Sequence, residues 1–244
     1  MKTRRDWTSQ DRFWEKAGQI GYGDALFRSK RVEAHVMGNQ WRVALDTARR
    51  IGIPGGGTVL ELGCGDGAFA ANVLGPVYGR VDAVDKSQAA IERATARGAP
   101  AHVRFRAADV SQLTYRDEDR WDGAFLMGFL HHIKRHTPAV LSRLSRVAER
   151  LVVLEPNGNN RVRRLLERLP SYRNAGEQSF RFTELLRIFE SCGYRVETQL
   201  SVNLFPPFTP DILFTPIRAL ERMVEGHPAF HPLCTSWILG FVAR

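Results

Sequence analysis

The sequence is poor in cysteine. Its 244 residues include only three, Cys64, Cys192 and Cys234, which lie far apart and form no CxxC pair. Disulfide frameworks and structural zinc sites depend on cysteines at close, repeated spacing. We therefore expect neither of these in this chain, and no metal centre.

Long apolar runs are also lacking. No stretch approaches the roughly 20 apolar residues that cross a bilayer. The first 19 residues are polar and charged, without the apolar segment of a secretory signal. We expect no transmembrane segment and a cytoplasmic location.

Acidic residues are outnumbered, since 26 Asp and Glu face 35 Lys and Arg, which gives a formal net charge of +9. A basic chain can bind nucleic acid or a membrane surface, but here the charge is spread along the sequence. The densest basic stretch runs from Arg161 to Arg173. We interpret it as the polar face of one helix, with Leu165, Leu166 and Leu169 on the other face.

Strand and helix patterns alternate along the chain, which is typical of a mainly parallel sheet with helices on both faces. The length suits one α/β domain. The predicted strands are Thr58–Leu62, Arg80–Val84, His102–Arg106, Trp121–Met127, Leu151–Leu154, Arg195–Leu200 and Ser236–Val242. The predicted helices between them are Ala68–Leu74, Gln88–Ala96, Pro138–Ala148 and Thr183–Ser191.

Two segments lie outside this alternation. Residues 1–50 hold several aromatic residues and one or two predicted helices, and we interpret them as an N-terminal helical cap. Residues 51–244 form the predicted core. Within the core, residues 203–233 are rich in proline and aromatic residues and are long for a simple connection, so we interpret them as a lid inserted before the last strand.

A glycine-spaced turn follows the first predicted strand. Gly63, Gly65 and Gly67 form a GxGxG pattern, and the acidic Glu61 stands near the end of the strand. Glycine is required where the backbone bends with positive φ or approaches a ligand closely. A dinucleotide-binding turn more often has its third glycine one position later, facing a pyrophosphate.

Acidic residues also follow the next two predicted strands. Asp85 stands at the tip of the second strand, where a carboxylate can accept two hydrogen bonds from a ribose diol. Asp109 comes just after the third strand, in Ala-Ala-Asp-Val, placed to accept from an adenine amino group. The fourth strand leads into Leu-His-His-Ile at 130–133.

Together, these motifs resemble those of the class I S-adenosylmethionine-dependent methyltransferases, and most of all their small-molecule branch, which includes the ubiquinone- and menaquinone-type enzymes. The resemblance covers Thr58 to Glu155 well and the rest in topology alone. It implies a Rossmann-like sheet of seven strands with the last antiparallel, to which Ser236–Val242 fits. It also implies S-adenosylmethionine as cofactor.

The resemblance also implies a role for each matching residue. Three glycines pass under the methionine moiety, Glu61 lies near its ammonium, Asp85 binds the ribose, and Asp109 and Val110 meet the adenine. The residues implied for the cofactor site are Glu61, Gly63, Cys64, Gly65, Gly67, Asp85, Lys86, Asp109, Val110, Met127 and Gly128.

Methyl transfer to a hydroxyl needs in-line alignment and removal of a proton. His131 and His132 stand beside the expected methyl position, and Glu155 ends the fifth predicted strand at the same sheet edge. Each is a candidate base, with a purely structural role as the alternative. We expect Trp14, Tyr22, Phe27, Phe205 and Phe208 to line an apolar acceptor pocket.

The expected acceptor is therefore a small molecule of aromatic, isoprenoid or lipid character, methylated on oxygen. An RNA methyltransferase is the alternative that the basic charge leaves open. However, the Asn/Asp-Pro-Pro-aromatic run of enzymes that methylate base amines is missing after the fourth strand, so we expect no specific nucleic acid partner. A cofactor-binding regulatory protein is a third alternative.

Overall fold

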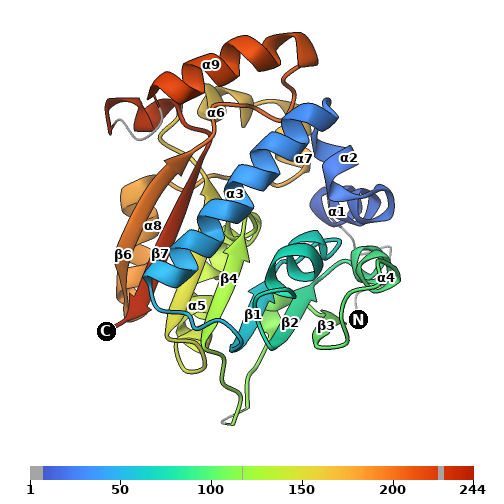
Figure 1. Cartoon of the computed structure of the whole chain (residues 1–244), viewed down its shortest axis with the longest axis vertical. Coiled ribbons are helices and arrows are strands. Elements are labelled where there is room, and N and C mark those ends of the chain that lie inside the picture. Colours follow the sequence, from blue (N-terminus) through green and yellow to red (C-terminus); the bar gives the residue numbers. More distant parts are fainter. Residues whose placement is uncertain (1–7, 117, 225–227) are drawn as a thin grey trace.

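The computed structural model describes residues 8–116, 118–224 and 228–244 and confirms the predicted α/β architecture (Figure 1). These residues form a seven-stranded sheet in the order β3-β2-β1-β4-β5-β7-β6. Strand β7 is antiparallel to both β5 and β6, and the remaining pairs are parallel. The strands are β1 (Thr58–Leu62), β2 (Arg80–Asp85), β3 (Val103–Ala107), β4 (Gly123–Met127), β5 (Arg150–Pro156), β6 (Tyr194–Val202) and β7 (Ser236–Ala243).

Helices cover both faces of this sheet, as Figure 1 shows. None of those in the described part of the chain is long and apolar enough to span a bilayer. The α-helices are α1 (Ser9–Ile20), α2 (Tyr22–Leu26), α3 (Lys30–Arg50), α4 (Gln88–Ala96), α5 (Thr137–Leu144), α6 (Arg161–Leu166), α7 (Pro170–Asn174), α8 (Phe182–Ser191) and α9 (Phe214–Val224). Shorter helical turns are η2 (Ala70–Leu74, π-helical), η3 (Val110–Gln112), η4 (Leu130–His136), η5 (Asp211–Leu213) and η6 (Pro228–Leu233).

Side-chain alternation along the strands builds a core on each face. Leu60 and Leu62 of β1 pack with residues of α5 and α8, whereas Val59 packs with residues of α3 and η2. Both sets are buried because a parallel sheet between two helical layers leaves neither face to water. Glu61 shares the α3 face of β1 with Val59, since side chains two apart point to the same side.

The predicted boundary at residue 50 does not separate two structural units. Helix α3 packs on the sheet, where its Val43, Ala44 and Ala48 are buried with Val152 and Ile238 of the central strands. Helix α3 is therefore part of the core, and the cap consists of α1 and α2. The prediction assigned α3 to the cap because this helix precedes the first strand in the chain. In the structure α3 packs on β5 and β7, which come later in the sequence.

The segment 203–233 folds as η5, α9 and η6 and packs on α3. His35 of α3 pairs with Glu221 of α9 at 2.7 Å, and Asn39 donates to Asn203 at 2.8 Å. At the other end of the segment, Asn160 donates to the backbone oxygen of Leu233 at 3.0 Å. These contacts attach the segment to α3 and to the start of α6.

The single helix predicted for the arginine-rich stretch is two short helices, α6 and α7. Pro170 begins α7, and a turn separates it from Leu166, the last residue of α6. A proline lacks the N–H that a continuous helix would need at this point. Leu165 and Leu169 are exposed to solvent in this arrangement.

Candidate active site

The glycine loop after β1 has the backbone conformation that the sequence predicted. Gly63, Gly65 and Gly67 have φ values of 75°, 55° and 72°, a region that L side chains rarely adopt. A Cβ at Gly67 would lie 2.6 Å from the Phe105 ring, and one at Gly65 would lie 2.9 Å from the Tyr22 ring. The loop therefore depends on glycine for both its conformation and its neighbours.

Asp85 holds this loop from the tip of β2. One carboxylate oxygen accepts from the Gly65 N–H at 2.8 Å, and the other accepts from the Ser87 N–H at 2.9 Å. Each carboxylate oxygen has two lone pairs, so Asp85 retains acceptor capacity toward a diol. Its position beside the loop is the one the sequence motif required.

Glu61 is buried beneath the same loop. Its Oε2 has no hydrogen-bond partner among the residues described, and burial, with smaller contributions from Asp85 and Asp66, raises the pKa of its carboxyl to about 8. A buried polar atom without a partner is costly. An ammonium group placed there would supply the missing partner, so the residues present fit the methionine end of S-adenosylmethionine.

The residues predicted around the adenine have different surroundings. Asp109 accepts from the backbone N and the hydroxyl of Ser111 at 2.9 and 2.7 Å, which makes it the cap of η3. Lys86 lies 2.6 Å from Asp11 of α1 and 3.9 Å from Asp109. The Val110 side chain is buried in the core under α5, so it offers a ligand only its backbone.

The remaining residues of the cofactor set border the loop. Gly128 follows β4 with φ 72°, and its N–H donates to the Leu154 oxygen at 2.7 Å. Met127 is half-buried at the end of the same strand. Cys64 is buried in the core beside α3, and burial raises the pKa of its thiol, so it fills space and is not activated as a nucleophile.

Glu155 at the end of β5 anchors the turn that carries the two histidines. This fully buried carboxylate accepts from the N–H groups of Leu130 and His131 at 2.9 and 3.2 Å, and from His131 Nδ1 at 2.9 Å. Three hydrogen bonds from η4 occupy its two oxygens. Glu155 therefore fixes the backbone of this turn and the ring of His131.

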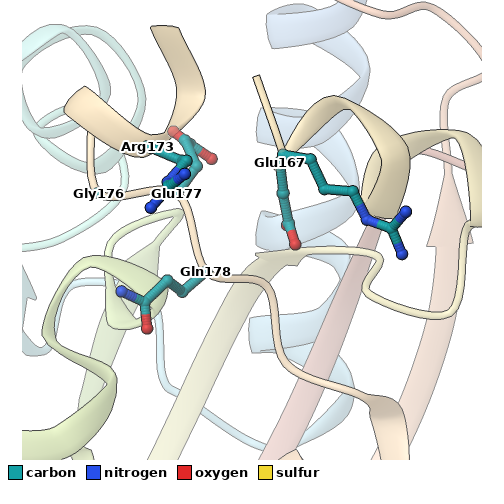
Figure 2. A pocket seen from close by; sticks show the side chains of 6 residues that line it. Glu167, Arg173, Gly176, Glu177 and Gln178 are labelled. Atoms are coloured by element: carbon teal, nitrogen blue, oxygen red, sulfur yellow. The ribbon is translucent and has the colours of Figure 1, made fainter. Parts of the chain in front are cut away.

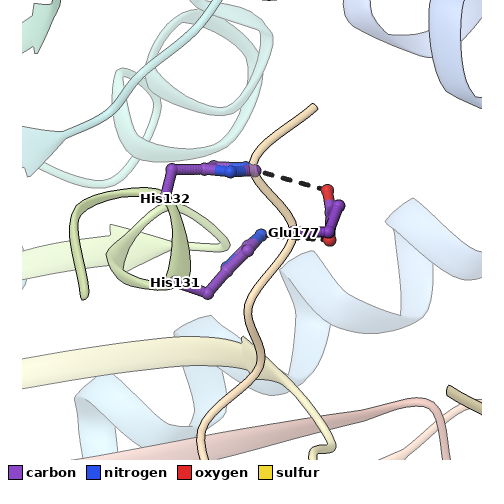
Figure 3. Close-up of side chains that lie close together, drawn as sticks. All are labelled: His131, His132 and Glu177. Atoms are coloured by element: carbon purple, nitrogen blue, oxygen red, sulfur yellow. Dashed lines mark ion pairs between the residues drawn. The ribbon is translucent and has the colours of Figure 1, made fainter. Parts of the chain in front are cut away.

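A second carboxylate, Glu177, reaches the histidine pair from the loop after α7. Both rings point toward it, with His131 Nε2 at 3.4 Å and His132 Nε2 at 3.9 Å (Figure 3). Arg163 of α6 pairs with Glu177 on its other side. No sequence motif marked Glu177, which lies more than 40 residues from the histidines in the chain.

The surroundings of the two histidines shift their pKa values in opposite directions. Burial alone would lower the pKa of His131, but the carboxylates of Glu155 and Glu177 raise it to about 9. Burial and the neighbouring His131 charge lower the pKa of His132 to about 3. His131 is therefore a cation between two carboxylates, whereas His132 is neutral near pH 7, and its Nδ1 has no hydrogen-bond partner in the described residues.

The donor atoms of His131, His132 and Glu177 lie within 4.8 Å of one another, so they could together hold a metal ion. The cluster is already balanced without one. The cations His131 and Arg163 face the carboxylates of Glu155 and Glu177. The absence of a metal centre stays a prediction.

A cavity of about 370 Å³ adjoins the cluster. Glu167 lies on one side of it, and Arg173, Gly176, Glu177 and Gln178 lie on the other (Figure 2). Glu177 belongs both to this cavity and to the histidine cluster. The cavity is lined by charged and polar side chains, whereas the sequence analysis predicted aromatic ones.

Helix α1 covers the site. Trp14 stacks on Tyr22 with ring centroids 5.5 Å apart and contacts His132 edge-on at 4.6 Å, and its Nε1 donates to the Ala175 oxygen. Because Tyr22 lies against Gly65, a row of rings joins the glycine loop to the histidines. Trp14 and Tyr22 thus lie beside the histidines and the glycine loop, and their role in lining an acceptor pocket stays a prediction.

The other three aromatic residues predicted for the pocket lie elsewhere. Phe27 and the buried Phe205 pack with Val32 and Val36 of α3 in a small core under α9, and Phe208 is exposed. Their sequence context, rich in proline and aromatics, is shared by lids and by small cores. The apolar pocket predicted from them is therefore not the one observed.

Comparison with known proteins agrees with this geometry. Residues 59–150 match a family described as a methyltransferase domain. No protein with a curated description matches the chain.

Several solved structures are similar over nearly the whole chain. The [4+2]-cyclase SpnF has a TM-score of 0.68 at 18% identity and covers 98% of this chain and 97% of its own. A chain of the Haloferax volcanii complex between the Trm112 methyltransferase activator and a methyltransferase has a TM-score of 0.66 at 17% identity, and the match covers 95% of this chain and 97% of that one. Magnesium protoporphyrin IX methyltransferase from Synechocystis PCC 6803, solved with bound S-adenosylmethionine, has a TM-score of 0.62 at 14% identity, and the match covers 99% of this chain and 100% of that one.

These likenesses and the sheet order agree in fold and leave the acceptor open. Among the similar structures, one catalyses a cyclisation, so the fold by itself does not specify the reaction. Residues 59–150 match a methyltransferase domain family, and the chain has the Rossmann-like fold seen in S-adenosylmethionine-dependent methyltransferases.

Proposed function

We propose that this chain transfers a methyl group from S-adenosylmethionine to a hydroxyl oxygen of a small molecule, with His132 as the base. The observation that carries the proposal is the row of rings from Gly65 through Tyr22 and Trp14 to His132. It joins a loop suited to the cofactor to a neutral histidine, in one covered region of the carboxyl edge.

The cofactor part rests on four groups of the chain. Glu61 pairs with the ammonium, and the glycine loop passes under the methionine moiety. Asp85 accepts hydrogen bonds from the ribose hydroxyls, and Asp109 accepts one from the adenine amino group. When bound, S-adenosylmethionine supplies a methyl group on a positively charged sulfur, which leaves as a neutral thioether when an acceptor attacks in line.

The proposal that His132 is the base rests on its neutral state near pH 7, at which the neighbouring His131 is charged. His132 accepts the hydroxyl proton on its ring nitrogen while the acceptor oxygen bonds to the methyl carbon. The carboxylate of Glu177, 3.9 Å from the His132 ring, stabilises the imidazolium that forms. Glu155 and His131 act as positioning residues, since their hydrogen bonds fix the turn that carries His132.

The cavity beside Glu177 supports an acceptor of mixed character. Arg168 and Arg173 line it, and these guanidinium groups suit a carboxylate or phosphate on the acceptor. The half-buried ring of Trp14 offers an apolar surface nearby. We therefore propose a lipid-like or isoprenoid acceptor that carries an anionic group.

The test compares His132→Ala with His136→Ala, an exposed histidine of the same turn. Label transfer from methyl-tritiated S-adenosylmethionine into a solvent extract of small molecules measures turnover, and calorimetry with S-adenosylhomocysteine measures cofactor binding. His132→Ala should lower turnover by about 10²- to 10⁴-fold and leave binding within about threefold. If both variants keep full turnover, His132 is not the base.

RNA is the second candidate acceptor, and the arginine-rich stretch of α6 and α7 is the observation that favours it. This alternative predicts label transfer into RNA and retention on RNA that falls steeply with salt. Label in RNA, with none in the solvent extract, would replace the small-molecule proposal.

A further inference from the structure

Exposed apolar side chains are concentrated in one part of the molecule. Ten of the twelve large hydrophobic residues that are exposed in the described chain lie between residues 162 and 233. The α9 helix and α6 lie together at one end of the molecule, beyond the carboxyl ends of the strands (Figure 1). Scattered exposed apolar residues are normal, but a concentration of this kind indicates a binding surface.

Helix α6 and the turn after it present one apolar stripe. Val162 and Leu165 are three residues apart on α6 and share a helical face, and Leu169 follows in the turn before α7. Their exposed fractions are 61%, 62% and 47%. The face that a soluble helix ordinarily buries is here left open to solvent.

Helix α9 and the turn before it present a second stripe. Ile212 of η5 is 84% exposed, and on α9 Leu220 and Met223 are three residues apart and share an exposed face, with Met223 81% exposed. The opposite side of α9 carries the buried Glu221, which pairs with His35 of α3. Helix α9 therefore packs Phe214, Ile217 and Val224 inward beside Glu221, and it leaves Leu220 and Met223 exposed.

Hydrogen bonds join the two regions. Asn160, the cap of α6, donates to the backbone oxygen of Leu233 in η6, and Asn157 donates to the oxygen of His231 at 3.0 Å. Leu233 is itself exposed. These bonds attach the insertion at η6 to the start of α6. We call the exposed apolar residues of the two regions together the exposed patch, and they are Val162, Leu165, Leu169, Ile212, Leu220, Met223 and Leu233.

Basic residues flank this exposed patch. The stretch 161–173 contains five arginines and a single glutamate, and Arg161, Arg164 and Arg168 are exposed beside the α6 stripe. Exposed Arg222 lies next to Met223 on α9. Apolar side chains between arginines are the pattern of a helix that lies in the headgroup region of an anionic bilayer.

We propose that the exposed patch docks on the surface of an anionic lipid bilayer, with its apolar side chains among the acyl chains and its arginines on lipid phosphates. An RNA surface would use the arginines but leave the apolar stripes without a role. The cavity that ends at Glu177 is lined by Arg168 of the same stretch, so docking places its wall near the bilayer. The binding itself does not depend on the proposed methyl transfer.

Vesicle sedimentation of the full chain tests the proposal at about 150 mM salt. Vesicles of phosphatidylcholine with phosphatidylglycerol should bind the protein, and pure phosphatidylcholine should bind it at least tenfold less well. The double variant Ile212→Ser/Met223→Ser should lose at least tenfold of the binding. The matched control is Ile20→Ser, which changes an exposed apolar residue of α1 outside the patch, and thermal unfolding should show that all variants fold.

Equal binding of the double variant and the control would overturn the proposal, as would no binding of the wild type to either vesicle. Tight retention on RNA that Arg161→Glu/Arg164→Glu abolishes, while Ile212→Ser/Met223→Ser leaves it unchanged, would assign the surface to nucleic acid instead. If the wild-type protein binds anionic vesicles but transfers no methyl group, the proposed reaction is contradicted and the proposed membrane docking is not.

Discussion

The two halves of the carboxyl edge are built in different ways. Beside β1 and β2, the site is centred on the backbone of three glycines with positive φ, which the side-chain carboxylates of Asp85 and Glu61 support. Beside β4 and β5, the site consists of side chains brought from four elements, with Glu155, His131, Glu177 and Arg163 in one ionic cluster.

This difference governs how each half responds to change. A site formed by glycine backbone tolerates no added side chain. Its residues lie close together in the sequence, so it does not depend on distant partners. A side-chain cluster instead depends on distant partners, and removal of one partner leaves a buried charge without compensation. Variants in the two halves should therefore separate cofactor binding from the stability of the acceptor side.

The largest effect should follow from Gly65→Arg. The residue has φ 55°, and its Cβ would lie 2.9 Å from the Tyr22 ring, so the side chain strains the loop and fills the space over it. Calorimetry should detect no binding of S-adenosylhomocysteine, where the wild type binds at micromolar levels, or about −8 kcal/mol. Gly38→Ala on α3, where no atom lies within 4 Å, is the control. Unchanged binding by Gly65→Arg would remove the loop from the cofactor site.

The next effect should come from His131→Gln and appear in stability. The pKa of His131 is raised from 6.5 to about 9, so its charged form stabilises the folded state by about 3 kcal/mol. This contribution is complete below about pH 6.5 and is lost as the pH rises through 9. Urea unfolding should show a large deficit for the variant at pH 6 that shrinks by pH 10, with His136→Gln as control. A deficit independent of pH would contradict the charged state of His131.

Asp85→Ala should have a smaller effect, confined to the cofactor half. The carboxylate loses its proposed bonds to the ribose and its bond to the Gly65 N–H, and affinity should fall by roughly 1–3 kcal/mol. Asp85→Asn should lose less, because the amide keeps one acceptor oxygen. If calorimetry shows that Asp85→Ala lowers the affinity less than threefold, Asp85 supports the loop but does not bind the ribose.

The smallest expected effect is a pH dependence of cofactor affinity. The pKa of Glu61 is raised to about 8, so its carboxyl is mostly protonated at pH 7 and must release a proton to pair with an ammonium. Affinity for S-adenosylhomocysteine should therefore rise between pH 6 and 7.5, by up to about tenfold per pH unit. Glu61→Gln should bind more weakly and without this slope, and a wild-type affinity that is flat with pH would place the ammonium elsewhere.

Much of the cofactor half could be predicted from the sequence. The positive φ of the three glycines, the strand tip at Asp85 and the order of the motifs are set by residues close together in the chain. Glycine conformation and the alternation of strand and helix are local properties. The resemblance to a known family, and not the local pattern, implied the seven-stranded sheet with its antiparallel last strand, which the structure confirms.

The acceptor half could not be predicted in the same way. Glu155 was a candidate base, but its oxygens accept three hydrogen bonds from the histidine turn. Glu177 carried no motif at all. The aromatic residues at both ends of the chain looked alike in the sequence, yet Trp14 covers the histidines while Phe205 is buried under α9.

The sequence by itself determined the alternation of strands and helices and the glycine loop, because these follow from short-range backbone requirements, and its resemblance to a known family indicated the sheet topology and the cofactor class. The tertiary structure alone decided which aromatic residues cover the site, which histidine is charged, and which apolar helical faces are left open. Each of these depends on burial and on partners distant in the chain, and a side chain's surroundings cannot be read from its neighbours in sequence. His131 and His132 illustrate this, since they are adjacent and identical in type. The carboxylates of Glu155 and Glu177 make His131 a cation, whereas burial and the His131 charge keep His132 neutral.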